Sequence, residues 1–139
     1  MAYVENIQTV YSDKRRAICK YVLDGTGLRT GVKATIVDVS ALGWGTDLCK
    51  IIKTKAEFDT NAAVGGLWNL YWDSGTDMFI MGGLMTKTTR LPNSLDLDFT
   101  SFGGLRNDAG GSPTGDIVIE TTSITTTLSL FMILEVKRC

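Results

Sequence analysis

Residues Leu128 to Lys137 read Leu-Ser-Leu-Phe-Met-Ile-Leu-Glu-Val-Lys and form the most strongly strand-like run of the chain. Side chains alternate between the two faces of a β-strand, so this stretch divides into two faces. One face is apolar throughout: Leu128, Leu130, Met132, Leu134 and Val136. The other carries Phe131 and Ile133 between polar residues. A strand that is apolar on both faces is covered on both sides. We therefore expect Leu128–Val136 to be a central strand, with Phe131 and Ile133 under a crossing segment or a neighbouring subunit.

A second β-rich run, Asp116–Thr122, precedes this stretch and is separated from it by a short polar connection. β-branched residues dominate the run, which is typical of strands. Two such runs joined by a short loop predict a β-hairpin. The last third of the chain is therefore expected to form one antiparallel pair.

Further strands are predicted upstream from alternating apolar and polar residues. Arg15–Asp24 is the clearest of them, with one apolar face. The N-terminal run is either an edge strand or an extended arm, within residues 1–12. The expected upstream strands are Tyr3–Ser12, Arg15–Asp24, Val32–Val39, Leu48–Phe58, Leu67–Asp73, Asp77–Met81 and Leu95–Phe99.

The Leu48–Phe58 run changes phase in its middle, because Cys49 and Ile51 have one parity while Ile52 and the following apolar residues have the other. A single β-bulge near Ile51 and Ile52 would keep both halves facing the core. A helix is the competing interpretation, since lysine, alanine and glutamate favour helices. The run lacks a clean helical stripe, so we prefer the bulged strand.

The pair Leu67–Asp73 and Asp77–Met81 predicts a hairpin whose register is open, because a two-residue turn and a three-residue loop pair different residues. Trp68 and Trp72 share a face with Leu70, which favours a core or interface position over an open sugar site. Gly82 and Gly83 are expected to end the pair. The later segment Thr100–Gly115 is glycine-rich and is expected to be an irregular, functional loop.

Together these runs predict an all-β, single-domain sandwich over residues 1–139. It should be jelly-roll-like, with about eight to nine antiparallel strands and little or no helix. The length of 139 residues fits one domain that can bury a sizeable core. A hydrophobic content of 44% and a charged content of 21% are those of a globular chain. A net charge of −1 favours neither nucleic acid nor an anionic membrane as a partner.

The sequence contains no histidine, which removes the usual general base and the commonest metal ligand. We expect no enzyme, no metal and no cofactor. Asp96 and Asp98 have the spacing of a cation or acid–base pair, but the wet side of an amphipathic strand explains them better. Cys19 and Cys49 are expected to be buried free thiols and Cys139 an exposed one, in a protein made in a reducing cytosol. No signal peptide or membrane-spanning run is recognised.

Two short basic clusters, Lys14–Arg16 and Lys137–Arg138, are either solvated strand ends or contacts for an acidic partner surface, and we favour the former. Trp44 lies between Gly43 and Gly45 and is either a plug on the core or a side chain offered to a partner. Burial is the more common position for a large aromatic, which favours the plug.

Most of the chain resembles small virion proteins of bacteriophages that infect cyanobacteria and other aquatic bacteria. It is similar in turn to the capsid cement or decoration proteins of tailed phages. The resemblance begins at the Val-Asp-x-Ser-x-Leu motif and includes an aromatic strand, its return strand, a glycine-rich loop and the final strand. The matching segments are Val37–Leu42, Trp68–Asp73, Met78–Met81, Phe102–Gly115, Thr114–Ile117 and Phe131–Lys137.

The resemblance implies a homotrimer that binds the major capsid protein on the outer surface of the phage head. The net charge of −1 leads us to expect no nucleic acid and no membrane as partner. A receptor- or carbohydrate-binding module of a tail or neck appendage is the alternative, motivated by the aromatic hairpin and the aspartate pairs. The expected contact residues come from the N-terminal arm, the Trp44 loop, the glycine-rich loop and the last strand: Tyr3, Val4, Ile7, Trp44, Phe102, Leu105, Arg106, Phe131 and Ile133.

Overall fold

The computed structural model describes residues 3–25, 32–45, 48–60, 66–85, 94–107, 113–122 and 128–138. These ranges contain ten strands and one single-turn 3-10 helix, which confirms the all-β prediction. The strands are β1 (Tyr3–Ser12), β2 (Arg16–Gly25), β3 (Val32–Val37), β4 (Cys49–Thr60), β5 (Gly66–Trp72), β6 (Met78–Met85), β7 (Ser94–Asp98), β8 (Leu105–Arg106), β9 (Ile117–Thr122) and β10 (Leu128–Arg138).

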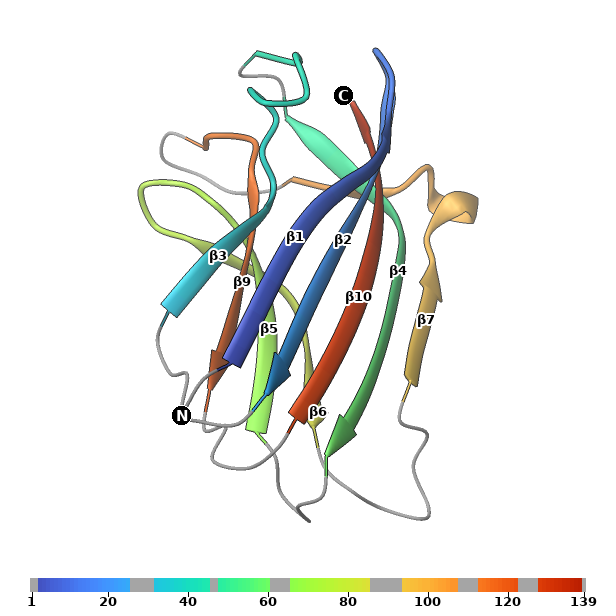
Figure 1. Cartoon of the computed structure of the whole chain (residues 1–139). Helices are drawn as coiled ribbons and strands as arrows, with labels where there is room; N and C mark the ends of the chain where they lie inside the picture. Colours follow the sequence, from blue (N-terminus) through green and yellow to red (C-terminus); the bar gives the residue numbers. More distant parts are fainter. Residues whose placement is uncertain are drawn as a thin grey trace.

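The strands form two antiparallel sheets that pack face to face (Figure 1). Sheet A has the order β1-β2-β10-β4-β7, with β8 also paired to β4, and sheet B has the order β3-β9-β5-β6. Eight of these strands make two four-stranded sheets, β2-β10-β4-β7 and β3-β9-β5-β6, between which the chain passes repeatedly. This order is that of a double-sheet jelly roll. The predicted jelly-roll-like sandwich is therefore confirmed.

Strand β10 is central in sheet A, as predicted. It pairs antiparallel with β2 on one side and with β4 on the other, over nearly its whole length. Leu130, Met132, Leu134 and Val136 are completely buried in the core. The apolar parity of this strand thus correctly predicts both its place in the sheet and the face that packs against sheet B.

The predicted hairpin of the last third is wrong. Strand β9 lies in sheet B between β3 and β5, whereas β10 lies in sheet A. The two strands therefore belong to different sheets and do not pair, and the predicted connection at residues 123–127 lies outside the described ranges. Both strands are central in their own sheets. The two edges of β9 pair with β3 and β5, and those of β10 pair with β2 and β4, so neither strand has an edge left for the other.

The predicted bulge in β4 is confirmed. Glu135 pairs with Lys53, but the next residue of β10, Val136, pairs with Ile51, so Ile52 is the extra residue. Ile51 and Thr54, on either side of this point, are both buried. The bulge therefore restores the inward phase after the change of parity, and the helical interpretation of this run is excluded.

The β5–β6 hairpin differs from the prediction at both ends. Pairing begins at Trp72 and Met78, so five residues form the connection, more than either turn that we considered. The strand β6 also continues through both glycines to Met85, where we expected it to stop. A Cβ at Gly82 would lie 2.3 Å from Asn69 Oδ1 and 2.8 Å from Trp68 O. Glycine is therefore a steric requirement of the pairing and not a strand terminator.

The segment predicted as an irregular loop is partly regular. A 3-10 turn at Thr100–Phe102 and the two-residue strand β8 occupy its first part. The turn ends at Gly103, which adopts a left-handed conformation with φ of 76°. Only glycine adopts this conformation without strain. Gly103 of the predicted loop is therefore explained by a tight turn.

The core between the sheets contains Trp44, Trp68 and Trp72. Cys19 and Cys49 are buried free thiols, as expected, while Cys139 lies outside the described residues. In the part of the chain that the structure describes, no helix has the length and apolar character needed to cross a membrane.

Candidate functional site

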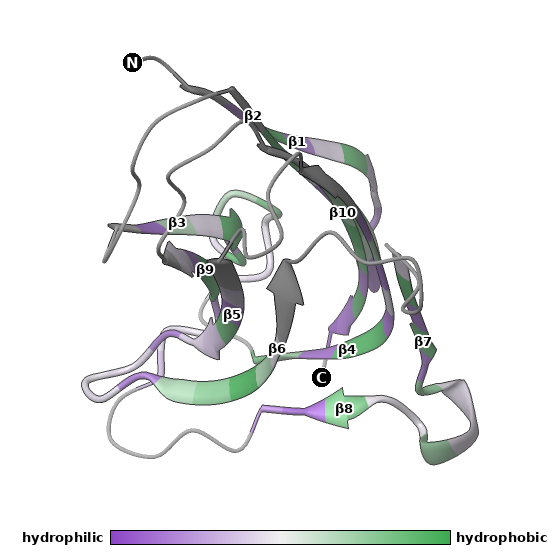
Figure 2. Cartoon of the chain, turned by 90° about the horizontal axis from the view of Figure 1, so that it is seen from below, coloured by the Kyte–Doolittle hydropathy of each residue, from purple (hydrophilic) through white to green (hydrophobic). Residues whose placement is uncertain are grey.

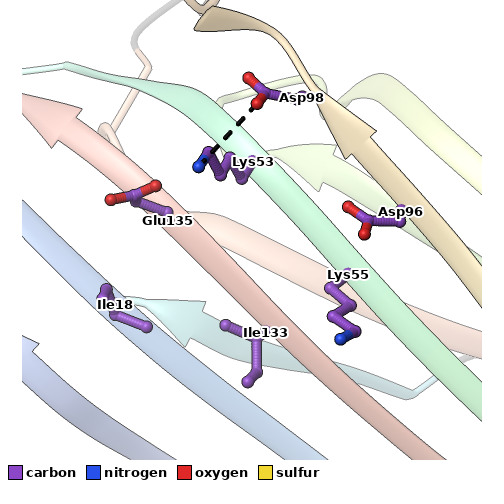
Figure 3. Close-up of a pocket in the computed structure, with 7 residues that line it drawn as sticks. All are labelled: Ile18, Lys53, Lys55, Asp96, Asp98, Ile133 and Glu135. Atoms are coloured by element: carbon purple, nitrogen blue, oxygen red, sulfur yellow. Dashed lines mark ion pairs between the residues drawn. The ribbon is translucent and has the colours of Figure 1, made fainter.

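The outer face of sheet A carries a shallow hollow formed by four adjacent strands (Figure 3). Strand register fixes its floor in two parallel rows. One row runs Ile18, Glu135, Lys53 and Asp98 across β2, β10, β4 and β7. The next row runs Lys20, Ile133, Lys55 and Asp96 across the same strands. All except Lys20 line the hollow.

Two ion pairs involve charged groups of this hollow, one within it and one with Arg16 outside it. Lys53 Nζ lies 3.9 Å from Asp98 Oδ2, and Arg16 Nη1 lies 3.3 Å from Glu135 Oε1. The hydroxyl and then the amide of Thr100 lower the pKa of Asp98, because both donate hydrogen bonds to its carboxylate. Asp98 is therefore ionised and serves the turn that follows β7. The interpretation of Asp96 and Asp98 as the wet side of a strand is favoured over a catalytic pair.

Two apolar side chains of β10 interrupt this charged face. Phe131 is 38% exposed, so no described segment covers it, and Ile133 is partly exposed on the same face. Ile18 of β2 lines the hollow beside Ile133 (Figure 3). Phe131 and Ile133 could be predicted from the sequence but Ile18 could not, because only the strand pairing places β2 next to β10.

Strand β1 forms one edge of sheet A and pairs only with β2 among the described strands. Ile7, Val10 and Tyr11 are exposed there, with Val10 at 54%. The expected contact residues Tyr3 and Val4 lie in the same strand, but their side chains are outside the described part. Residues 3–12 thus form an edge strand of sheet A. Val10 and Tyr11 were not among the predicted contacts.

Trp44 is not available as a contact residue, because it is only 2% exposed. Its Nε1 donates a hydrogen bond of 3.1 Å to the carbonyl oxygen of Asp13. The interpretation of Trp44 as a plug on the core is confirmed. Trp68 and Trp72 are also buried, so the suggested sugar-stacking surface of tryptophans does not exist.

The other predicted contacts lie along the β7–β8 edge of sheet A. Phe102 is 80% exposed at the end of the 3-10 turn, and Arg106 is exposed on β8. Leu105 packs against the core and is only partly accessible. These residues are on the edge opposite to β1, so the predicted contacts fall into three separate areas: β1, the centre of β10, and the β7–β8 edge.

Among the described residues, no group of three or more cysteines, aspartates and glutamates is placed to hold a metal ion. One carboxylate nevertheless has an unusual environment. Partial burial raises the pKa of Asp116, and the nearby carboxylates of Asp38 and Asp73 raise it further, against a 3.0 Å hydrogen bond from Val39 N. This bond joins the start of β9 to the loop after β3, which is a structural role.

No protein-family model matches the chain, and comparison with curated proteins finds no significant match. Solved structures are similar at low identity. The acidic stable capsid structure of Helicobacter pylori bacteriophage KHP30 contains a chain that is 8% identical, with a TM-score of 0.44 over 98% of this chain and 94% of that one. The capsid asymmetric unit of cyanophage Pam1 contains one that is 15% identical, with a TM-score of 0.46 over 96% and 85%.

The structure of tomato aspermy virus is also similar, at 10% identity and a TM-score of 0.36, over 99% of this chain and 78% of that one. All three TM-scores are below 0.5, so these likenesses carry no conclusion about function. The jelly-roll assignment rests on the strand order of the chain itself.

Proposed function

We propose that this chain is a virion structural protein, and specifically a capsid decoration or cement protein of a tailed phage. It would act without catalysis, on the outer surface of the head, by bridging copies of the major capsid protein. The sequence resemblance to phage cement proteins supports this role, and so does the double-sheet jelly roll, an architecture that viral capsid domains share with lectins and cupins.

The observation that carries the proposal is the apolar surface that sheet A leaves exposed. Edge strands offer unpaired backbone groups to other chains, and proteins usually protect them with charge, proline or short length. Strand β1 is ten residues long and carries exposed Ile7, Val10 and Tyr11. A bulge near Val10 twists its last part, so Tyr3–Thr9 is the regular portion open to a partner strand.

The proposed mechanism is mechanical. The edge of β1 adds to a neighbouring sheet, and Phe131 with Ile133 is buried under an adjacent subunit in a homotrimer. Phe102 and Arg106, on the other edge, contact the capsid lattice. Each contact is small, but several contacts made by one linked assembly reinforce one another, which lets a small protein stabilise a large shell.

The test is to mix the purified protein with undecorated heads and image them by electron cryo-microscopy. Wild-type protein should add density at local symmetry axes, and its mass in solution should be that of a trimer. Phe131→Lys should abolish both results, because it places a charge in the buried interface. Phe79→Lys is the matched control, since Phe79 is also exposed but lies on sheet B. Heads that stay bare with wild-type protein contradict the proposal.

A further inference from the structure

Four cationic residues lie in one row across sheet A. Arg16 of β2 pairs with Lys137 of β10, Lys137 pairs with Lys50 of β4, and Lys50 pairs with Arg106 of β8. Residues 16, 50, 106 and 137 are far apart in sequence, so only the strand register brings them together. We call these four residues the cationic row.

All four side chains point away from the core. The adjacent row consists of Ala17, Val136, Ile51 and Leu105, which are buried or pack against the core. Side chains alternate between faces, so the cationic row must point outward. Figure 2 shows β8 changing from hydrophobic to hydrophilic colouring along its length, and hydrophilic colouring at the end of β10 beside the C-terminus.

More positive charge lies at the same end of the sheet. Arg138 N donates a 2.7 Å hydrogen bond to the carbonyl oxygen of Arg15, so the basic clusters 14–16 and 137–138 are adjacent. A second hollow, at the other end of the row, is lined by Lys50 and Arg106 together with Leu48 and Asn107. The two clusters that looked like separate strand ends in the sequence thus lie side by side at one end of the sheet.

The repulsion between these four cations destabilises the folded chain when no ligand is bound. Like charges directly opposite each other on neighbouring strands destabilise a sheet. Arg16 has Glu135 at 3.3 Å, but Lys137 and Lys50 each have a cationic cross-strand neighbour on both sides. An anionic ligand would relieve this repulsion.

We propose that the cationic row binds an extended acidic segment of a partner protein. The four strands are about 4.8 Å apart, so the row spans about 14 Å. Alternate side chains of an extended segment are about 6.8 Å apart, so three of them also span about 14 Å. The ligand is therefore an extended segment with acidic residues at three alternate positions, lying across sheet A, with the two arginines at the ends able to bind carboxylates through paired hydrogen bonds.

The charge distribution favours such a segment over a nucleic acid. The whole chain has a net charge of −1, which is unlike the strongly basic domains that bind nucleic acids. The proposed binding of an acidic segment does not depend on the virion role, because it is inferred from the charges of this chain alone.

The test uses a fluorescent peptide, Glu-Val-Glu-Val-Glu, with Lys-Val-Lys-Val-Lys and a single-stranded oligonucleotide as comparison probes, in fluorescence anisotropy titrations. Wild-type protein should bind the acidic peptide, and the affinity should fall steeply as salt rises. The double variant Lys50→Gln/Lys137→Gln should weaken binding about tenfold or more, which corresponds to about 1.4 kcal/mol or more. Circular dichroism before titration establishes that each variant is folded.

The matched control is Lys20→Gln/Lys55→Gln, which also removes two lysines from the outer face of sheet A but leaves the cationic row intact. This variant should bind the acidic peptide as the wild type does. Equal loss of binding in both double variants would overturn the assignment to the row. Absence of acidic-peptide binding by the wild type, or tighter binding of the oligonucleotide, would overturn the proposed ligand. None of these measurements uses phage heads, so they stand or fall separately from the decoration role.

Discussion

Trp44 Nε1 donates a 3.1 Å hydrogen bond to the carbonyl oxygen of Asp13, 31 positions earlier in the chain. Asp13 in turn organises the β1–β2 turn, since its Oδ1 accepts hydrogen bonds from the amides of Arg15 and Arg16 at 2.7 and 2.8 Å. The buried Trp44 therefore links the loop after β3 to the β1–β2 turn. This turn connects the edge strand β1 to Arg16, the first residue of the cationic row.

Trp44→Phe should lower the free energy of unfolding by about 1–3 kcal/mol, because it leaves the Asp13 carbonyl without this donor. The aromatic ring still fills much of the same space, so the fold should persist. Urea denaturation would show a lower midpoint with an unchanged slope. An unchanged midpoint would mean that the hydrogen bond contributes nothing to stability.

Phe131 and Met132 are neighbours in β10 but point to opposite faces. Met132→Ala should cost about 2–5 kcal/mol, because it leaves a cavity in the core. Phe131→Thr should change stability by roughly 0.5 kcal/mol or less in the isolated chain, as expected for a surface position. It should nevertheless weaken self-association in analytical ultracentrifugation. If Phe131→Thr is as destabilising as Met132→Ala in the monomer, Phe131 has a partner within its own chain.

Lys137→Gln should raise the free energy of unfolding at low salt by about 0.2–1 kcal/mol, because it removes like-charge repulsion within the cationic row. The gain should shrink in high salt, where the remaining charges are screened. Thermal or urea unfolding at two salt concentrations measures it. Lys20→Gln serves as the control, because Lys20 pairs with the neutral Ile133. A destabilised Lys137→Gln at low salt would show that the row is favourable in the free chain.

Asp116→Asn should stabilise the protein at neutral pH. The pKa of Asp116 is raised above its ordinary value of 3.8 by burial and by neighbouring carboxylates, so its ionised form is unfavourable in the folded state. Asparagine keeps an oxygen that can accept the bond from Val39 N. The wild type regains this stability as pH falls through the raised pKa, so the difference should disappear in acid. A constant difference across the pH range would exclude ionisation as its cause.

Asp77→Asn should have the opposite pH dependence. The ammonium group of Lys33 and the amide of Ser74 lower the pKa of Asp77 below 3.8, by hydrogen bonds of 2.5 and 3.1 Å. A lowered pKa stabilises the fold above the ordinary value, and this contribution is lost as pH falls through the folded pKa. The variant should therefore be less stable than the wild type at neutral pH, and the two should converge in strong acid. Urea midpoints measured from pH 7 downward would test this.

Much of the local structure could be predicted from the sequence. Alternation in Arg15–Asp24 and in Leu128–Val136 identified strands and their buried faces, because the period of two is a covalent property of extended chain. The phase break at Ile52 revealed a bulge for the same reason. The glycines at 82 and 83 were misjudged as a strand end, because β6 continues through both, and the steric requirement at Gly82 comes from Asn69 and Trp68 on the partner strand.

The candidate surfaces were harder to predict. Phe131 and Ile133 were found because a doubly apolar strand is unusual in itself. Ile18 was missed because its position beside Ile133 depends on which strand pairs with β10. Trp44 was proposed both as a plug and as a contact, and only its burial and its bond to Asp13 decide between the two.

Local patterns were therefore sufficient to predict the all-β class, the bulge and the inward faces, since these depend on residues close together in the chain. The assignment of β9 and β10 to different sheets needed the folded structure, and so did the row formed by Arg16, Lys137, Lys50 and Arg106. The physical reason is that strand pairing is a choice among many distant partners, set by how the whole core is buried. A local pattern indicates which face of a strand is buried, but it does not indicate which strand pairs with it.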